Sequence, residues 1–427
     1  MSTFKHFIRY GTNAEKKFIQ DFLEHFNGIV FNANMVSMYA GSIASFLYKS
    51  RKEYFIDPLT HAFAHSLGFL RNEKGEIKKS LKKLAEHYKI DHIILEENRP
   101  LKAKDFQDET FLKTFFDSVI NFQKNIIHDN LEDEWKELVE FLGFKNEPSY
   151  IIVPYFYMDI NNYKTWKEIN IKFIELAQGK YYSQIVISKE LLKEKDFINE
   201  ITYELNKTKG VFYWIDNFDE TKATKEELKN LLYFVEKIKV KKINLYGGYF
   251  SQLLKFKGLN GVVHGLEYGE SREVVPVGGG IPVAKYYLPA IKKRLNAVDI
   301  IEILYAKQIN TENKFYETIC YCKKCKEIKG ENIEEIINEF LNTFALTKVF
   351  KYKKNEKEYY REYPIPESKI NSLYHYLYVK NLEFEKIKNK TKKELLEELE
   401  KNYQEFESIL PDGFLDYLKN WKVVLDV

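Results

Sequence analysis

Three cysteines lie close together in a 427-residue chain that contains no others: Cys320, Cys322 and Cys325. Their CxCxxC spacing lets three thiolates converge on one tight turn, as a tetrahedral metal ion requires. An odd, clustered set of cysteines is a poor disulfide framework. His375, at the start of an expected helix downstream, is the natural fourth ligand. Three thiolates and an imidazole would form a closed site, which predicts a structural zinc ion; the alternative is three ordinary cysteines.

Four acids each follow directly on an apolar, strand-like run: Asp57, Asp159, Asp216 and Glu270. In a parallel barrel all strand carboxyl ends meet on one face, so these acids would surround a single mouth. Acids among aromatic rings suit chemistry at a sugar carbon, where positive charge develops beside a heterocycle that stacks. The alternative is that each acid forms a turn or caps the next helix.

The stretch HGLEYGE, from His264, ends another strand-like run. Gly265 and Gly269 would let the backbone approach a planar ligand closely, and Glu267 and Glu270 could accept its hydrogen bonds. An ordinary strand-to-helix turn has the same composition.

Two further motifs have both a structural and a functional interpretation. His61 and His65 are four residues apart and could bind a metal on one helix face, but no acid completes an HExxH pattern, which favours a structural pair. Gly278–Gly280 could bind a phosphate before the following helix, or could form a flexible turn.

A predicted hairpin from Lys348 alternates basic and aromatic residues: Lys348, Lys351, Lys353, Lys354, Lys357 and Arg361 with Phe350, Tyr352, Tyr359 and Tyr360. Basic side chains beside rings that can stack suit a nucleic-acid backbone and its bases. A solvated hairpin is the alternative.

The elements that must position these residues alternate between apolar strand-like runs and helical patterns. Eight such runs begin at Gly28, Glu53, Tyr150, Tyr181, Gly210, Lys241, Asn260 and Glu273. Strands this apolar are typical of a parallel sheet buried on both faces, so we expect an α/β fold, a (β/α)8 TIM-type barrel. We assign the barrel to residues 1–311, with a helical insertion at about 71–147, and a zinc-binding helical subdomain with the basic hairpin to 312–427.

Composition limits the class of protein. The formal net charge is +3 and 44% of residues are hydrophobic, which predicts a packed core and no strong overall field for nucleic acid or membrane. No apolar run reaches membrane-spanning length and the first residues lack a signal peptide pattern, so we expect a soluble, cytoplasmic protein.

Taken together, the barrel pattern, GLxxGE and CxCxxC with a downstream histidine resemble the tRNA-guanine transglycosylase superfamily. The resemblance implies exchange of guanine for a 7-deazaguanine in tRNA or DNA, through a covalent sugar–enzyme intermediate, on a barrel that carries zinc. It also implies that Gly265, Leu266 and Glu270 bind substrate and that the three cysteines and His375 bind the ion.

The catalytic roles follow from the same resemblance. Asp57 matches the early acid/base aspartate, and Asp159 the aspartate that recognises the base; Asp216 would line the same mouth. AVDIIEIL resembles the segment of the nucleophile, which implies Glu302 in that role, or Asp299. Pro58 and its successors replace the family's Ser-Gly-Gly-Phe-Gln signature. We therefore keep two alternatives, a catalytically altered barrel that binds nucleic acid or a protein partner, and a barrel glycosidase.

Overall fold

The computed structural model describes residues 4–11, 15–141, 147–266, 270–274, 285–354 and 357–426. The chain divides into two compact units, Met1–Asp219 with Lys229–Val277, and Glu220–Leu228 with Gly278–Val427. The predicted boundary at 311/312 therefore falls inside the second unit. None of the helices in the described ranges has the length and apolar content that a bilayer crossing needs.

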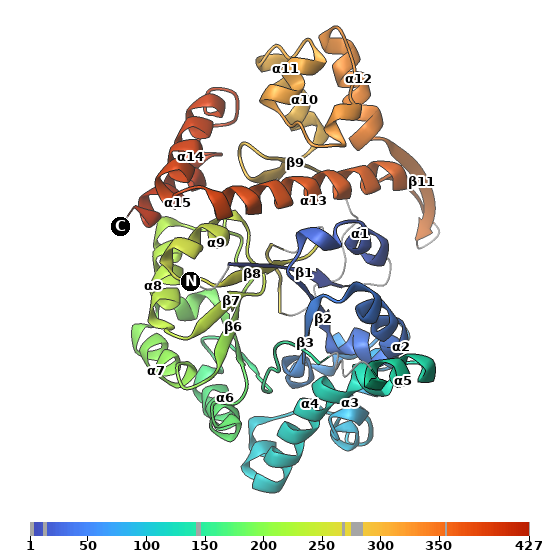
Figure 1. Ribbon diagram of the computed structural model, residues 1–427, viewed down its shortest axis with the longest axis vertical. Coiled ribbons are helices and arrows are strands. Elements are labelled where there is room, and N and C mark those ends of the chain that lie inside the picture. The colour runs from blue at the N-terminus through green and yellow to red at the C-terminus, as the bar shows by residue number, and fades with distance from the viewer. Residues whose placement is uncertain are drawn as a thin grey trace. The chain divides into compact units, whose positions relative to one another are not determined.

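An eight-stranded sheet, parallel at every pairing, forms the first unit (Figure 1). Its strands lie in the order β3-β2-β1-β8-β7-β6-β5-β4. Their bounds are β1 Lys5–Tyr10, β2 Gly28–Asn32, β3 Glu53–Asp57, β4 Tyr157–Met158, β5 Ser183–Ser188, β6 Gly210–Asp216, β7 Lys241–Asn244 and β8 Gly261–His264. The prediction of a parallel α/β fold is confirmed. Every residue of β2 is buried, as expected for a strand covered on both faces.

The sheet is curled, and a short segment links its two outer regions. Tyr150 forms a parallel bridge to Phe55 of β3, and Ile152 forms one to Tyr182, next to β5. Backbone hydrogen bonds from Ser149 to Tyr54 and from Tyr182 to Ile151 support these bridges. The segment before β4 thus bonds to both β3 and the start of β5.

Helices connect the strands and lie outside the sheet (Figure 1). They are α1 Lys16–Asp21, α2 Ala33–Ser50, α6 Tyr163–Ala177, α7 Lys195–Leu205, α8 Lys225–Lys237 and α9 Tyr249–Leu253. Between β3 and β4 the chain forms α3 Lys79–His87, α4 Glu109–Asp129 and α5 Asp133–Phe141, in the region of the expected insertion. Asp108 starts α4 as an N-cap, because its side chain accepts hydrogen bonds from the Thr110 and Phe111 amides.

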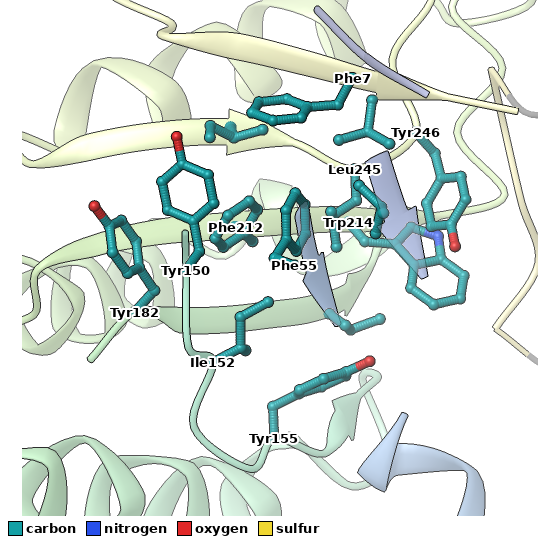
Figure 2. Close-up of a cluster of buried hydrophobic side chains, with 14 of the residues drawn as sticks. Phe7, Phe55, Tyr150, Ile152, Tyr155, Tyr182, Phe212, Trp214, Leu245 and Tyr246 are labelled. Atoms are coloured by element: carbon teal, nitrogen blue, oxygen red, sulfur yellow. The ribbon is translucent and has the colours of Figure 1, made fainter. Parts of the chain in front are cut away.

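Aromatic side chains fill the inner face of the curled sheet. Figure 2 shows Trp214 and Tyr246 at one end of this cluster and Tyr150 and Tyr182 at the other. Their ring centroids are 4.7 Å and 5.0 Å apart within each pair. Rings that interlock this closely hold the strand ends in fixed positions.

Helices predominate in the second unit. Its helices are α10 Ala297–Ala306, α11 Glu312–Thr318, α12 Ile333–Phe344, α13 Pro366–Asn389, α14 Lys392–Phe406 and α15 Asp416–Leu425. Two antiparallel pairs accompany them, β9 Tyr286–Leu288 with β10 Lys293–Leu295, and β11 Thr347–Lys354 with β12 Lys357–Pro364. Pro366 fits the first turn of α13, where a missing N–H costs nothing.

Candidate functional site

The carboxyl ends of the strands carry a layer of polar side chains on the inner face of the sheet. Side chains two residues apart on a strand share a face. Core residues Phe7, Val30, Phe55, Val186 and Trp214 are each followed two residues later by a polar one. These polar residues are Arg9, Asn32, Asp57, Ser188 and Asp216. Asn32 lies opposite Asp57, and Ser188 opposite Asp216, so the strand ends are in register.

Asp57 is the most deeply buried acid of this layer, with 1% of its surface exposed. Its Oδ1 accepts three hydrogen bonds, from the Tyr155 hydroxyl (2.6 Å), the Leu59 amide (3.1 Å) and Gln184 Nε2 (3.3 Å). Burial raises the pKa of Asp57, although these donors oppose the shift. A carboxyl group that is held in one orientation and kept protonated toward higher pH is suited to act as a general acid.

His61 extends this hydrogen-bonded chain. Its Nδ1 lies 3.0 Å from the Tyr155 hydroxyl, and the two rings stack with centroids 5.2 Å apart. Because the Tyr155 hydroxyl donates to Asp57, it accepts from His61, which places the histidine proton on Nδ1. Burial keeps the pKa of His61 well below its ordinary value, so the ring is neutral. His61 therefore orients the Tyr155 hydroxyl that donates to Asp57, which favours this role over a metal site with His65.

Asp216 ends β6 on the same face as Asp57. Its Oδ2 accepts from the Tyr157 hydroxyl at 3.0 Å, and its Oδ1 from the Val274 amide at 2.7 Å. Burial raises the pKa of Asp216 as well. Asp159 has a different role, because its Oδ1 accepts from the amides of Asn161 and Asn162 and so forms the turn before α6.

Three neutral side chains leave polar atoms toward this layer without a partner in the described ranges: Asn32 Oδ1, Gln184 Oε1 and Ser188 Oγ. All three side chains are buried. Buried polar atoms are nearly always hydrogen-bonded in a folded protein, so these three atoms are candidates to bond to a ligand or to bound water.

Arg272 reaches the same edge from the segment that follows β8. Its carbonyl accepts from the Asn217 amide (2.9 Å) and from Trp214 Nε1 (3.0 Å), which fixes the segment to the end of β6. Its guanidinium donates to the Tyr246 hydroxyl at 2.7 Å and lies 5.5 Å from the Trp214 ring centroid.

The GLxxGE element lies only partly within the described residues. Gly265 and Leu266 are buried directly after β8, and the Gly265 carbonyl lies 2.9 Å from Nδ1 of buried His264. Glu270 is half-buried and begins the segment that carries Arg272. Glu267, Gly269 and Gly278–Gly280 lie outside the described residues.

Asp299 and Glu302 lie on helix α10 of the second unit, and not on a strand. Asp299 completes a capping box, since its Oδ2 accepts from the Asn296 amide at 3.0 Å. Glu302 is exposed one turn later on the same helix. The pattern AVDIIEIL is apolar at helical spacing, and the Asn296 cap decides in favour of the helix. These two acids therefore lie on a helix of the second unit and not at the end of a strand.

Cys320, Cys322, Cys325 and His375 converge in the second unit and lie close enough to bind a metal ion. Their ligand atoms are within 4.8 Å of one another, and all four residues are buried. Nδ1 of His375 lies 3.3 Å from the Cys322 sulfur and 3.4 Å from the Cys325 sulfur. A tetrahedral zinc site would separate its ligand atoms by roughly 3.5 Å. The fit supports the predicted ligand set.

Neighbouring groups orient these four residues. His375 Nε2 lies 2.7 Å from the Tyr287 carbonyl and donates to it, which leaves Nδ1 as the free ligand atom. Tyr286 stacks on the His375 ring at 4.1 Å, and its hydroxyl lies 3.1 Å from the Cys325 sulfur. Hydrogen bonds from Cys320 lower the pKa of Cys322, while burial raises the pKa of Cys325. A bound cation would favour ionisation of all three thiolates here.

The hairpin β11–β12 separates its charges between two faces. Residues opposite each other in an antiparallel pair share a face. One face carries Lys348, Phe350, Lys357, Tyr359, Arg361 and Tyr363. Both described acids of the hairpin, Glu358 and Glu362, belong to the other face, where Glu358 pairs with Lys351 at 2.6 Å. The first face is thus basic and aromatic among the described residues.

Comparison with known proteins adds no identity, because no protein-family model, curated protein or solved structure matches this chain. The candidate functions below therefore depend on the geometry and on the resemblance stated above.

Sequence reasoning found the acids but missed most of their partners. Tyr155, Gln184, Arg9 and Arg272 have no motif of their own. The signal for Arg9 was present, however, since Phe7 and Arg9 alternate with apolar residues in KHFIRY, a strand that the run of apolar segments did not include.

Proposed function

We propose that the carboxyl edge of the sheet catalyses glycosyl transfer, in which guanine in tRNA or DNA is exchanged for a 7-deazaguanine. The observation that carries the proposal is Asp57, a buried carboxyl group with a raised pKa in an aromatic setting, with Asp216 at the same edge. A carboxyl group of this kind can protonate a departing base, while a second carboxylate stabilises or attacks the sugar.

In the proposed reaction a nucleotide is unstacked from its neighbouring bases and binds at the carboxyl edge of the sheet. A carboxylate oxygen of Asp216 attacks the anomeric carbon as the glycosidic C–N bond breaks, and Asp57 gives its proton to the departing base. The incoming 7-deazaguanine then attacks the same carbon through its ring nitrogen. It loses its proton to Asp57, the ester bond to Asp216 breaks, and both acids return to their starting states.

The geometry favours these roles over the assignment that the resemblance implies. Among the described residues the donors of Asp57 all bond to Oδ1, so we assign Oδ2 to the substrate. Asp216 is assigned as nucleophile in place of Glu302 and Asp299 because it ends β6 in the same sheet in which Asp57 ends β3. We assign Asp159 a structural role, because its carboxylate forms the turn before α6.

The remaining parts of the proposal concern the scaffold. The bridges of Tyr150 and Ile152 support a closed (β/α)8 barrel whose fourth strand begins before β4. The four buried ligands of the second unit hold structural zinc, because a closed Cys3His set leaves no position for substrate. The basic and aromatic face of β11–β12 binds the nucleic acid, since phosphates pair with Lys348 and Arg361 while Phe350 and Tyr359 can stack on bases.

The test is incorporation of labelled guanine, or of a labelled 7-deazaguanine, into tRNA and into single- and double-stranded DNA. We expect incorporation by the zinc-loaded chain, and a loss of at least 100-fold, on the order of the effect of a general acid, in Asp57→Asn and Asp216→Asn. Glu302→Gln is the matched control and should retain the wild-type rate.

Two results would decide against the proposal. A folded, zinc-loaded chain that incorporates no base into any of these nucleic acids is not a base-exchange enzyme, and binding to nucleic acid without turnover would leave the non-catalytic alternative. If Glu302→Gln is inactive and Asp216→Asn is not, the roles follow the resemblance and the geometric assignment is wrong.

A further inference from the structure

Two arginines meet on one tyrosine ring at the carboxyl edge of the sheet. The guanidinium carbon of Arg9 lies 5.6 Å from the Tyr246 ring centroid, and that of Arg272 lies 5.5 Å from it. They come from opposite ends of the sheet-forming chain, Arg9 from the inner face of β1 and Arg272 from the segment after β8. Because β1 and β8 pair in the sheet, these distant residues become neighbours.

The two guanidinium groups repel each other, and a bound anion would relieve this repulsion. Burial lowers the pKa of Arg9, and the positive charge of Arg272 lowers it further. The acids that act on Arg9 are Glu15 and Asp57, and the Asp57 oxygen that accepts hydrogen bonds is already occupied by three donors. Nε of Arg9 has no hydrogen-bond partner among the described residues. Two half-buried cations held together in this way can attract an anion, to which Nε of Arg9 could donate a hydrogen bond.

The aromatic neighbours keep the two side chains in place. Tyr246 accepts a hydrogen bond from Arg272 at 2.7 Å, and Trp214 lies beneath the same guanidinium at 5.5 Å. Contacts of this kind restrict the side chain before a ligand arrives, which reduces the entropy that binding costs. A planar guanidinium then offers two parallel N–H groups to the oxygens of an oxyanion.

We propose that Arg9 and Arg272 bind a phosphoryl group of the substrate beside Asp57. This inference rests on the proposed function for the location of the substrate site but not for the reaction, because the experiment measures binding without turnover. A phosphate of a nucleic-acid backbone and the phosphate of a free nucleotide share this chemistry. In either case the arginines fix the sugar that carries the phosphate, while Asp57 acts on its base.

The experiment is calorimetric titration of the full, zinc-loaded chain with inorganic phosphate, guanosine, guanosine 5′-monophosphate and a short guanine-containing oligonucleotide. We expect the monophosphate to bind more tightly than guanosine. Arg9→Gln and Arg272→Gln should each weaken the monophosphate by roughly 10–100-fold, the effect of one charge-assisted contact, and leave guanosine unchanged. Arg294→Gln is the matched control, since Arg294 also lies over a tyrosine, at 4.0 Å from the Tyr376 ring, but in the second unit.

The outcomes separate this inference from base exchange. If both glutamine variants bind the monophosphate as tightly as the wild type, the inference is wrong, whether or not bases are exchanged. If binding depends on the arginines but no base is incorporated, the phosphoryl site stands and the proposed reaction fails. Should a glutamine variant not fold, Arg272→Lys keeps the charge without the planar fork, and an unchanged affinity there would also overturn the inference.

An oligonucleotide that binds far more tightly than the monophosphate, with the same dependence on the arginines, identifies the backbone as the source. Equal affinities identify the free nucleotide, and both results support the site.

Discussion

Removing the Tyr155 hydroxyl tests the role of Asp57 as a general acid. In Tyr155→Phe the hydrogen bond of 2.6 Å to Asp57 Oδ1 is lost, while the donors Leu59 and Gln184 remain. A buried hydrogen bond to an ionised group contributes about 1.5–3 kcal/mol to that form. Its loss therefore raises the pKa of Asp57 further and keeps the acid protonated at higher pH.

The assay is the rate of labelled guanine exchange as a function of pH. If protonated Asp57 starts the reaction, the alkaline limb of the profile is set by its ionisation. Tyr155→Phe should shift that limb to higher pH, so that the rate on the limb, relative to the optimum, rises roughly 10–100-fold, which is the same free energy expressed as a ratio.

Tyr88→Phe serves as the control for this shift. It removes a buried tyrosine bond of 2.8 Å to the carbonyl of Pro58, the residue next to Asp57, but no bond to the carboxyl group. The control should keep the profile of the wild type. A uniform loss of rate in Tyr155→Phe, or a shift of the acid limb instead, would refute the assignment of Asp57 as the acid.

Three further changes test the scaffold. Cys325→Ser should reduce bound zinc from about one ion per chain to a small fraction by elemental analysis, whereas Lys323→Gln in the same turn should not. Glu383→Gln removes the buried carboxylate that Lys292 and Lys380 share, at 3.4 Å and 3.0 Å, and should lower the free energy of unfolding in urea by about 3–5 kcal/mol. Because burial raises the pKa of Asp57, the wild type loses stability as pH rises through that pKa; Asp57→Asn should therefore melt higher than the wild type at about pH 8, and this advantage should vanish near pH 4.

The strands could be predicted because burial on both faces leaves a plain signal. The apolar runs at Gly28, Glu53, Gly210 and Lys241 became β2, β3, β6 and β7. The run EVVPVGGG did not become a described strand, since most of it lies outside the described residues. The eighth strand of the sheet is instead β1. It was not predicted because Lys5, His6 and Arg9 interrupt its apolar residues.

The metal ligands could be predicted for a different reason. Cys320, Cys322 and Cys325 are local in sequence, so their spacing alone fixes the shape of the turn. His375 could be predicted only because three thiolates need a fourth ligand to complete a tetrahedral site. Its tautomer is set by the Tyr287 carbonyl, and the sequence spacing does not predict that contact.

The catalytic layer lies between these two cases. That Asp57 and Asp216 would meet follows from the topology of a parallel sheet, in which strand ends share one edge whatever their separation in the chain. What each acid does depends on its donors, and the shortest hydrogen bond to each acid comes from a segment without regular structure: from Tyr155 in the stretch before β4, and from Val274 in the stretch after β8. Strand periodicity says nothing about such segments. The same sequence patterns that locate an acid therefore cannot tell a proton donor such as Asp57 from a turn former such as Asp159; the difference lies in three hydrogen bonds and the depth of burial.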